Sequence, residues 1–262
     1  MPPVVASPET AIAVVLIALI GVAMGLLGGG GSLLTVPLFV YLLGYPAKPA
    51  IVMGLPVVGL TCLVSAIQHY RAGNTDLRLA LVFAPVTMLG AFAGARAASL
   101  VSGEAQLAML GCVILVAAAA MFRSSRALGA IPIDGVTTPE PAGHHPALVA
   151  VTGGAVGLLT GLVGVGGGFL FVPALVVLGR VQMKRAIGTS LLVTAFTTAA
   201  AFVGYAGRVP VAWDVVGVMT AVAVVGALAG TALCGVVSQT ALKRGFALFL
   251  VAIGTFVLYR NR

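Results

Sequence analysis

Four consecutive glycines, Gly28 to Gly31, interrupt a hydrophobic stretch that runs from Ala11 to Leu43. A glycine inside a helix costs about 1 kcal/mol relative to alanine, so four in a row predict a break in the helix. Hydrophobic residues make up 60% of the 262 positions and charged residues only 8%, which is typical of a chain that crosses a membrane several times. Unwound backbone inside a membrane is tolerated only where protein or water surrounds it. The glycine run therefore predicts a broken helix that lines a path through the protein, as in transporter substrate sites.

The same pattern occurs again 136 positions later, as Pro37 and Pro173 show. The residues that match in the first register are Gly21, Gly25, Gly28, Gly30, Gly31 and Pro37, opposite Gly157, Gly161, Gly164, Gly166, Gly167 and Pro173. The register continues without a gap, with Lys48 on Lys184 and Gly94 on Gly230. One constant register over about eighty positions predicts an internal duplication. Within it, the G-x-x-x-G spacings at Gly21 and Gly157 favour close helix packing rather than ligand binding.

The expected fold is an all-α, multi-pass membrane protein with a first transmembrane repeat over residues 11–122 and a second over 147–259. A linker rich in Pro, Gly, Ser and Thr, at 123–146, is expected to separate them. Each repeat opens with two short hydrophobic pieces on either side of its glycines. At 1.5 Å per residue these pieces rise only about 17 to 25 Å, too little to cross a hydrocarbon core of about 30 Å comfortably. Three fuller hydrophobic spans then follow in each repeat.

The distribution of the 14 lysines and arginines distinguishes two topologies. If each broken segment crosses the membrane once, the repeats are parallel and the basic residues divide seven against seven. If each broken segment is a hairpin that enters and leaves by one face, the repeats are inverted and the division is nine against five. The nine are Arg71, Arg78, Arg123, Arg126, Arg180, Lys184, Arg185, Lys243 and Arg244. The positive-inside rule then favours inverted repeats in the cytoplasmic membrane, with this face cytoplasmic and both termini outside.

A glycine turn also predicts an anion site. Backbone N–H groups of such a turn can converge on an anion, and the helix that follows adds the positive end of its dipole. Two such turns from inverted repeats are expected to meet near the midplane. The residues predicted to bind the substrate are Gly30, Gly31, Ser32, Gly166, Gly167, Gly168, Thr189 and Ser190. For any single hydroxyl, a hydrogen bond to its own helix backbone is the competing role. Lys48 and Lys184 are predicted to line the access path or to cap helix ends.

The duplicated G-x-x-x-G-x-x-G-x-G-G pattern followed by a proline, with K-x-A-I in each half, resembles the sulfite exporter TauE/SafE family of membrane permeases. The resemblance extends from Ala11 to Tyr259. It implies a permease for a small anion, in this family a sulfur-containing oxyanion or organosulfonate such as sulfite or sulfoacetate. We expect movement by alternating access. The halves differ, because Ser32 stands opposite Gly168 and Met53-Gly54 opposite Thr189-Ser190.

Two other function classes stay open. An anion-selective channel is the main alternative, because broken helices also build pores. An intramembrane enzyme is disfavoured, because the sequence lacks a nucleophile and base, paired carboxylates or H-E-x-x-H at usable spacings. We therefore predict no catalytic residue, no metal ligand and no cofactor. The expected partners are a small anion and the lipid bilayer; nucleic acid is not among them, because no basic patch contains interleaved aromatic residues.

The carboxylates bear on what drives transport. All six fall in tails, loops or span ends, which disfavours coupling through a buried carboxylate relay. Uniport, exchange, and protonation of the substrate or of a histidine remain open. His69 is the one histidine near a span, and the sequence favours a helix-end position for it.

Overall fold

The computed structural model describes residues 8–113, 115, 146–164, 166–177 and 183–233. These residues form helices and contain no strand. The elements are α1 (Pro8–Leu27), the 3₁₀-helix η1 (Gly29–Leu34), α2 (Thr35–Pro37), the π-helix η2 (Leu38–Leu42), α3 (Ala47–Arg71), α4 (Leu77–Ala97), the 3₁₀-helix η3 (Ala98–Leu100), a helix at 103–113, α6 (Pro146–Val163), α7 (Gly168–Val177), α8 (Met183–Tyr205) and α9 (Trp213–Leu233). The predicted linker, apart from Pro146, and the last predicted span lie outside the described residues.

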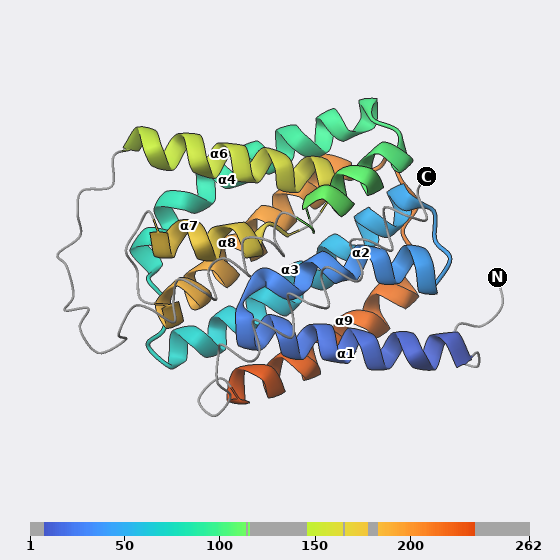
Figure 1. Ribbon diagram of the computed structural model, residues 1–262, viewed down its shortest axis with the longest axis horizontal. Coiled ribbons are helices and arrows are strands. Elements are labelled where there is room, and N and C mark those ends of the chain that lie inside the picture. The colour runs from blue at the N-terminus through green and yellow to red at the C-terminus, as the bar shows by residue number, and fades with distance from the viewer. Residues whose placement is uncertain (1–7, 114, 116–145, 165, 178–182, 234–262) are drawn as a thin grey trace.

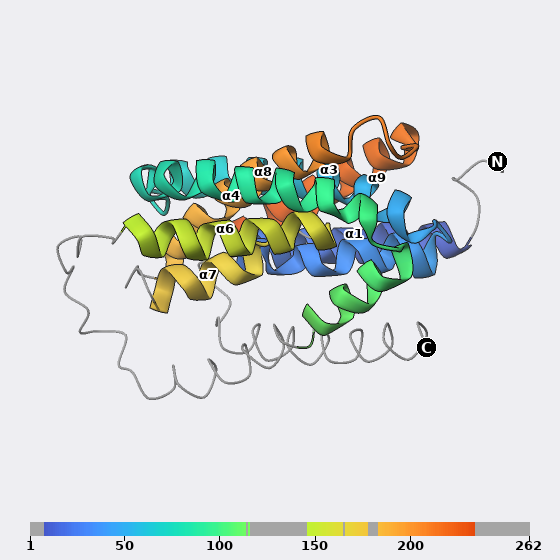
Figure 2. The same ribbon diagram turned by 90° about the horizontal axis from the view of Figure 1, so that it is seen from above.

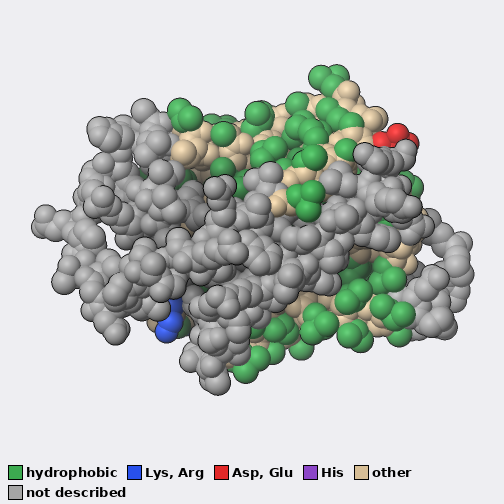
Figure 3. Space-filling model, viewed as in Figure 1, with side chains coloured by type: hydrophobic (Ala, Val, Ile, Leu, Met, Phe, Trp, Pro, Cys, Tyr) green, Lys and Arg blue, Asp and Glu red, His purple; other side chains and the backbone are tan. Residues whose placement is uncertain are grey.

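Four of these helices are long and apolar enough to cross a membrane, namely α3, α8, α9 and the continuous helical stretch Leu77–Leu100. Their outward positions carry large apolar side chains, such as Leu81 at 69% exposure and Val225 at 67%. Hydrophobic side chains dominate the described surface in Figure 3. Exposed leucine and valine on this scale suit contact with lipid rather than water. The all-helical membrane fold expected from the sequence is thus confirmed at this level.

Helix ends follow from local chemistry. Asp76 caps the N-terminus of α4, because its Oδ1 accepts a hydrogen bond from the Leu79 backbone N–H at 3.0 Å. This bond satisfies one of the N–H groups that a helix start leaves unpaired. The α1 helix stops before Gly28, which has φ +77° and therefore leaves the helical region. Gly164, the matched residue in the second half, has φ +72° and follows the last residue of α6.

The helices pack in matched pairs across the two halves. α1 lies along α9, α4 lies along α6, and α3 and α8 pack against each other between these pairs (Figures 1 and 2). In Figure 1, α1 enters from the right and residues 29–42 lead back to the right, whereas α6 enters from the left and α7 leads back to the left. Each half therefore opens with a helical hairpin whose tip is a glycine break inside the bundle.

Glycines make the two cross-half contacts possible. A Cβ on Gly21 or Gly25 would overlap the carbonyl oxygen of Ala223 or Ala227 on α9. The register of 136 residues relates these contacts to two others, in which Gly157 meets Thr87 and Gly161 meets Ala91. Backbone thus meets backbone along both pairs, because these glycines have no side chain to hold the helices apart. The prediction that these G-x-x-x-G spacings serve helix packing is confirmed.

Candidate functional site

The two glycine breaks meet in the interior of the bundle. A Cβ added to Gly29 would lie 2.4 Å from the Cα of Gly168, and the reverse distance is the same. Both glycines are buried. α7 begins at Gly168 and η1 begins at Gly29, so two helix starts converge at this point. Helix starts direct backbone N–H groups and positive dipole ends outward, which favours a negative charge beside them.

One buried hydroxyl lies at this meeting point, and a second lies beside the neighbouring residue Gly167. Thr194 on α8 is fully buried, and its Oγ1 lies 2.7 Å from the Cβ position of Gly168. Thr160 on α6 contacts the Cβ position of Gly167 through its own Oγ1. Within the described residues, neither hydroxyl has a hydrogen-bond partner, and the same holds for the buried Thr35 at the start of α2. Buried hydroxyls are normally satisfied, so unpaired ones beside a helix break indicate a place for a hydrogen-bonding ligand.

The predicted glycines have different surroundings in the structure. Gly166 lies between Val58, Thr194 and Thr198, and Gly168 lies against Gly29, so these two face the meeting point. Gly31 instead packs against Met24 and Ile20 of α1. Gly167 packs against Thr160 and Phe171, with φ +62°. Gly30 is buried in η1. Gly31 and Gly167 therefore pack within their own hairpins, whereas Gly166 and Gly168 lie at the meeting point of the two breaks.

The predicted hydroxyls already make hydrogen bonds. Ser32 Oγ donates to the Gly29 carbonyl at 2.6 Å, and Ser190 Oγ donates to the Ile187 carbonyl at 2.8 Å. Ser190 still lies close to the first break, 3.1 Å from the Cβ position of Gly28. Thr189 Oγ1 accepts from the Asp76 backbone N–H at 2.9 Å, which places it beside the loop between α3 and α4. Ser32 and Ser190 thus bond to the backbone of their own helical segment, which is the alternative to ligand binding that the sequence left open.

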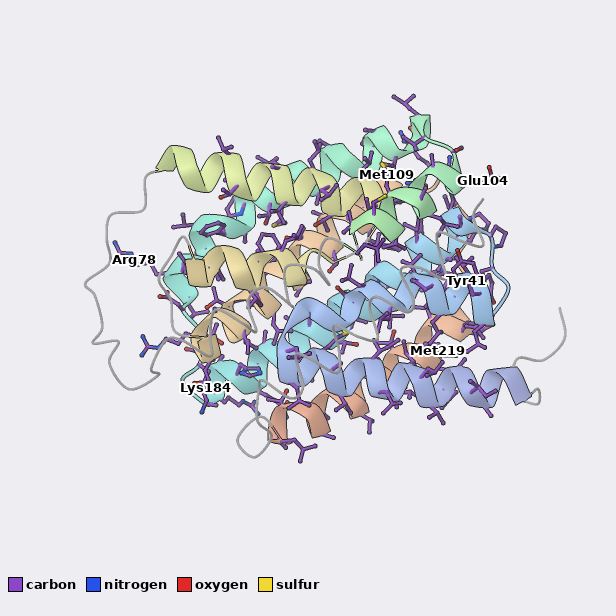
Figure 4. All side chains as sticks on the ribbon, in the orientation of Figure 1. Tyr41, Arg78, Glu104, Met109, Lys184 and Met219 are labelled. Carbon is purple, nitrogen blue, oxygen red and sulfur yellow. The ribbon has the colours of Figure 1, made fainter. Side chains whose placement is uncertain are left out.

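The two lysines occupy matched places. Lys48 lies in the first turn of α3 and is half-buried, and Lys184 lies in the first turn of α8 and is exposed. A first turn presents N–H groups rather than free carbonyls, so neither ammonium can cap the end of its own helix. In Figure 4, Lys184 lies at the same end of the molecule as Arg78, opposite Glu104 and Tyr41.

Thr194 and Thr160 were not predicted from the sequence as site residues. The register places Thr194 opposite Val58 and Thr160 opposite Met24. A hydroxyl in one half where the other half has an apolar side chain is a departure from the repeat, and that departure was the available signal. It was weak, because a buried threonine usually bonds to its own helix, as Thr198 does to Thr194 at 2.8 Å.

Comparison with known proteins agrees with this architecture. The family model described as Sulfite exporter TauE/SafE matches residues 13–257. The chain belongs to this family. It is therefore a membrane transporter and not an enzyme, as the sequence predicted.

Curated relatives of the chain are named as probable membrane transporter proteins. A "Probable membrane transporter protein" of Xylella fastidiosa is 32% identical over 253 residues, covering 93% of this chain and 92% of the relative. One from Haemophilus influenzae is 31% identical over 180 residues, covering 66% and 64%. The "Probable membrane transporter protein YdhB" of Bacillus subtilis is 22% identical over 193 residues, covering 71% and 75%. No solved structure matches the chain.

Proposed function

We propose that this TauE/SafE transporter carries a small anion, a sulfur-containing oxyanion or organosulfonate such as sulfite or sulfoacetate, by alternating access. The observation that carries the proposal is the contact between Gly29 and Gly168, where two helix starts converge beside the unpaired hydroxyl of Thr194. An oxyanion there would accept hydrogen bonds from backbone N–H groups and from that hydroxyl. Gly166, Gly168 and Gly29 form the backbone wall of the site, and Ser190 lies at its edge. Lys48 and Lys184 are assigned to the two access paths.

We also propose that the two halves are inverted repeats in the cytoplasmic membrane, with both termini outside. Two contacts support this. Thr189, near the start of α8, hydrogen-bonds to Asp76 at the end of the α3–α4 loop. A Cβ on Gly188 would meet the Asn74 carbonyl in the same loop. Parallel repeats would put that loop and the start of α8 on opposite faces, whereas inverted repeats put them together, with Arg78 and Lys184 on the basic face.

A transport screen tests the function. Purified protein in liposomes should give saturable uptake of a labelled sulfur-containing anion, and counterflow when the liposomes are preloaded with the same unlabelled anion. Sulfite, sulfoacetate, sulfate and a small carboxylate are tested in turn. Flux that neither saturates nor shows counterflow would favour a channel. No flux for any sulfur-containing anion would overturn the proposed substrate class.

Thr194→Val is expected to weaken anion binding about tenfold or more. Valine keeps the shape of the side chain but removes one hydrogen bond to a charged group, which contributes about 1.5 to 3 kcal/mol. The measurement is the half-saturating concentration for stabilisation of the detergent-solubilised protein by sulfite. Thr61→Val is the matched control, because Thr61 donates to the Val57 carbonyl of its own helix at 2.7 Å. Equal effects of the two substitutions would remove Thr194 from the site.

Labelling from one side of the membrane checks the topology. A single cysteine at Asn74 is expected to react with membrane-permeant maleimide only, and one at Gly207, in the turn after α8, with impermeant maleimide applied outside intact cells. The two turns lie at opposite ends of α8, because α8 starts beside Asn74 and ends at Tyr205. Reaction of the Asn74 cysteine from outside would contradict the proposed orientation.

A further inference from the structure

His69 is a buried imidazole that the anion site does not use. It lies near the end of α3 and is only 2% exposed. Its Nε2 lies 3.2 Å from the carbonyl oxygen of Gly25, in the last turns of α1 before the first break. A carbonyl oxygen only accepts, so Nε2 carries the hydrogen and Nδ1 is the bare nitrogen of the neutral ring. Nδ1 is also buried, and no described residue forms a hydrogen bond with it. The ring therefore offers a proton-accepting atom inside the bundle.

The second half shows that this position does not need a histidine for structure. Tyr205 stands 136 residues after His69, and its hydroxyl donates to the carbonyl of Gly161 at 3.0 Å. Gly161 in turn is the residue that matches Gly25. Both side chains thus tie the end of a long helix to the broken helix of the same half. Imidazole differs from phenol in one way that matters here, because its neutral ring has a bare nitrogen that can take up a proton, whereas a neutral phenol can only give one up.

We infer that His69 is a proton-binding site and that a proton moves together with the anion. The inference rests on the proposed function. A proton on Nδ1 leaves the hydrogen bond from Nε2 to Gly25 intact and places a positive charge at the C-terminal end of α1. The helix dipole stabilises a cation there. The charge also lies near the first glycine break, which begins at Gly28, so protonation raises anion affinity. By linkage, the anion raises proton affinity by the same factor, which couples the two movements.

The surroundings of His69 leave it as the interior group best suited to this role. In the described part of the chain, the other ionisable side chains on α3 and on the helices packed against it are Lys48, Cys62, Tyr70 and Arg71 on α3, Glu9 on α1, Tyr41 in η2, Lys184, Arg185 and Tyr205 on α8, and Asp214 on α9. The carboxylates of Glu9 and Asp214 lie in the first turn of their helices. Lys48, Lys184 and Arg185 also lie in a first turn, and Arg71 is the last residue of α3. Thiol and phenol groups ordinarily titrate well above neutral pH.

Proteoliposomes with the membrane potential held at zero by potassium and valinomycin test the coupling. The probe is labelled sulfoacetate, whose two acid groups both stay ionised between about pH 6 and 8. With an exterior about one pH unit more acidic than the lumen, wild type should accumulate the anion about tenfold and acidify a lumenal pH dye. His69→Gln and His69→Tyr keep a donor for Gly25 but cannot take up the proton, so gradient-driven accumulation should disappear. Tyr205→Phe is the matched control and should accumulate the anion as wild type does.

Counterflow at equal pH distinguishes a failure of proton coupling from a failure of anion transport itself. Wild type that exchanges sulfoacetate but does not accumulate it under the proton gradient would overturn the inference and leave the proposed function standing. Accumulation by both His69 variants at the wild-type level would also overturn it. Wild type without counterflow for any anion of the screen would contradict the proposed function and this inference with it.

Discussion

Gly168→Val is expected to abolish both transport and stabilisation by sulfite, while the protein still inserts into the membrane. Its Cβ would be forced against the Cα of Gly29 and to within 2.7 Å of Thr194 Oγ1, so the side chain would push apart the helix starts and the hydroxyl that are proposed to hold the anion. Valine is at least as compatible with lipid as glycine, so insertion should not suffer. The measurements are liposome uptake and the shift in melting temperature on addition of sulfite.

The matched control is Gly217→Val on α9, where an added Cβ meets no atom within 4 Å. It should transport normally. Gly31→Val and Gly167→Val are also expected to abolish transport, but by a different route, because their side chains would meet Met24 and Thr160 within their own hairpins. If Gly168→Val is monodisperse and binds sulfite with unchanged affinity, the breaks are packing devices, and the site must be sought among the hydroxyls of α3 and α8.

Gly94→Leu is expected to lower the melting temperature by roughly 5 to 10 °C. Its Cβ would overlap the carbonyl oxygen of Leu158, so α4 and α6 would have to separate along their contact. Overpacking costs about 1 to 3 kcal/mol where side chains can adjust, and backbone against backbone adjusts least. In a protein of this size, each kcal/mol shifts the melting temperature by about 2 to 4 °C. Scanning fluorimetry in detergent measures the shift.

The second half supplies the comparison for this prediction. Gly230→Leu would meet the Val22 carbonyl in the matched contact between α9 and α1, so it should cost about as much as Gly94→Leu. A Cβ on Gly21 would likewise overlap the Ala223 carbonyl, so even Gly21→Ala should be destabilising. A large loss at Gly94 with none at Gly230 would contradict the equivalence of the two contacts.

The features of the fold that depend on glycines and on long hydrophobic stretches were mostly predictable from the sequence. The breaks after α1 and α6, the long spans and the glycine packing follow from residues whose backbone needs are specific, such as Gly28 and Gly164 with positive φ. The 136-residue register also identified which residues would make equivalent contacts. The register did not predict which helices of the two halves pack together. A sequence repeat shows which residues are equivalent, but not which residues are in contact.

The candidate site was predictable only in part. The meeting of two glycine breaks follows from the pattern, but which glycines face the site depends on rotation about the hairpin axis. That rotation turns Gly31 and Gly167 toward their own helices and Gly168 toward Gly29. Hydroxyl groups were harder still, since the hydrogen-bond partner of a buried threonine depends on which helix lies opposite. Ser32 therefore bonds to its own backbone, whereas Thr194, which no pattern singled out, lies beside the break.

The most direct test of the central claim is a structure of the protein bound to selenite, the selenium analogue of sulfite, with the anion located by anomalous scattering. We expect one strong selenium peak beside the contact of Gly29 with Gly168, with its oxygens within hydrogen-bonding distance of Thr194 Oγ1 and of backbone N–H groups at the starts of η1 and α7. A selenium peak elsewhere in the bundle, with no density beside this contact, would contradict the proposed site.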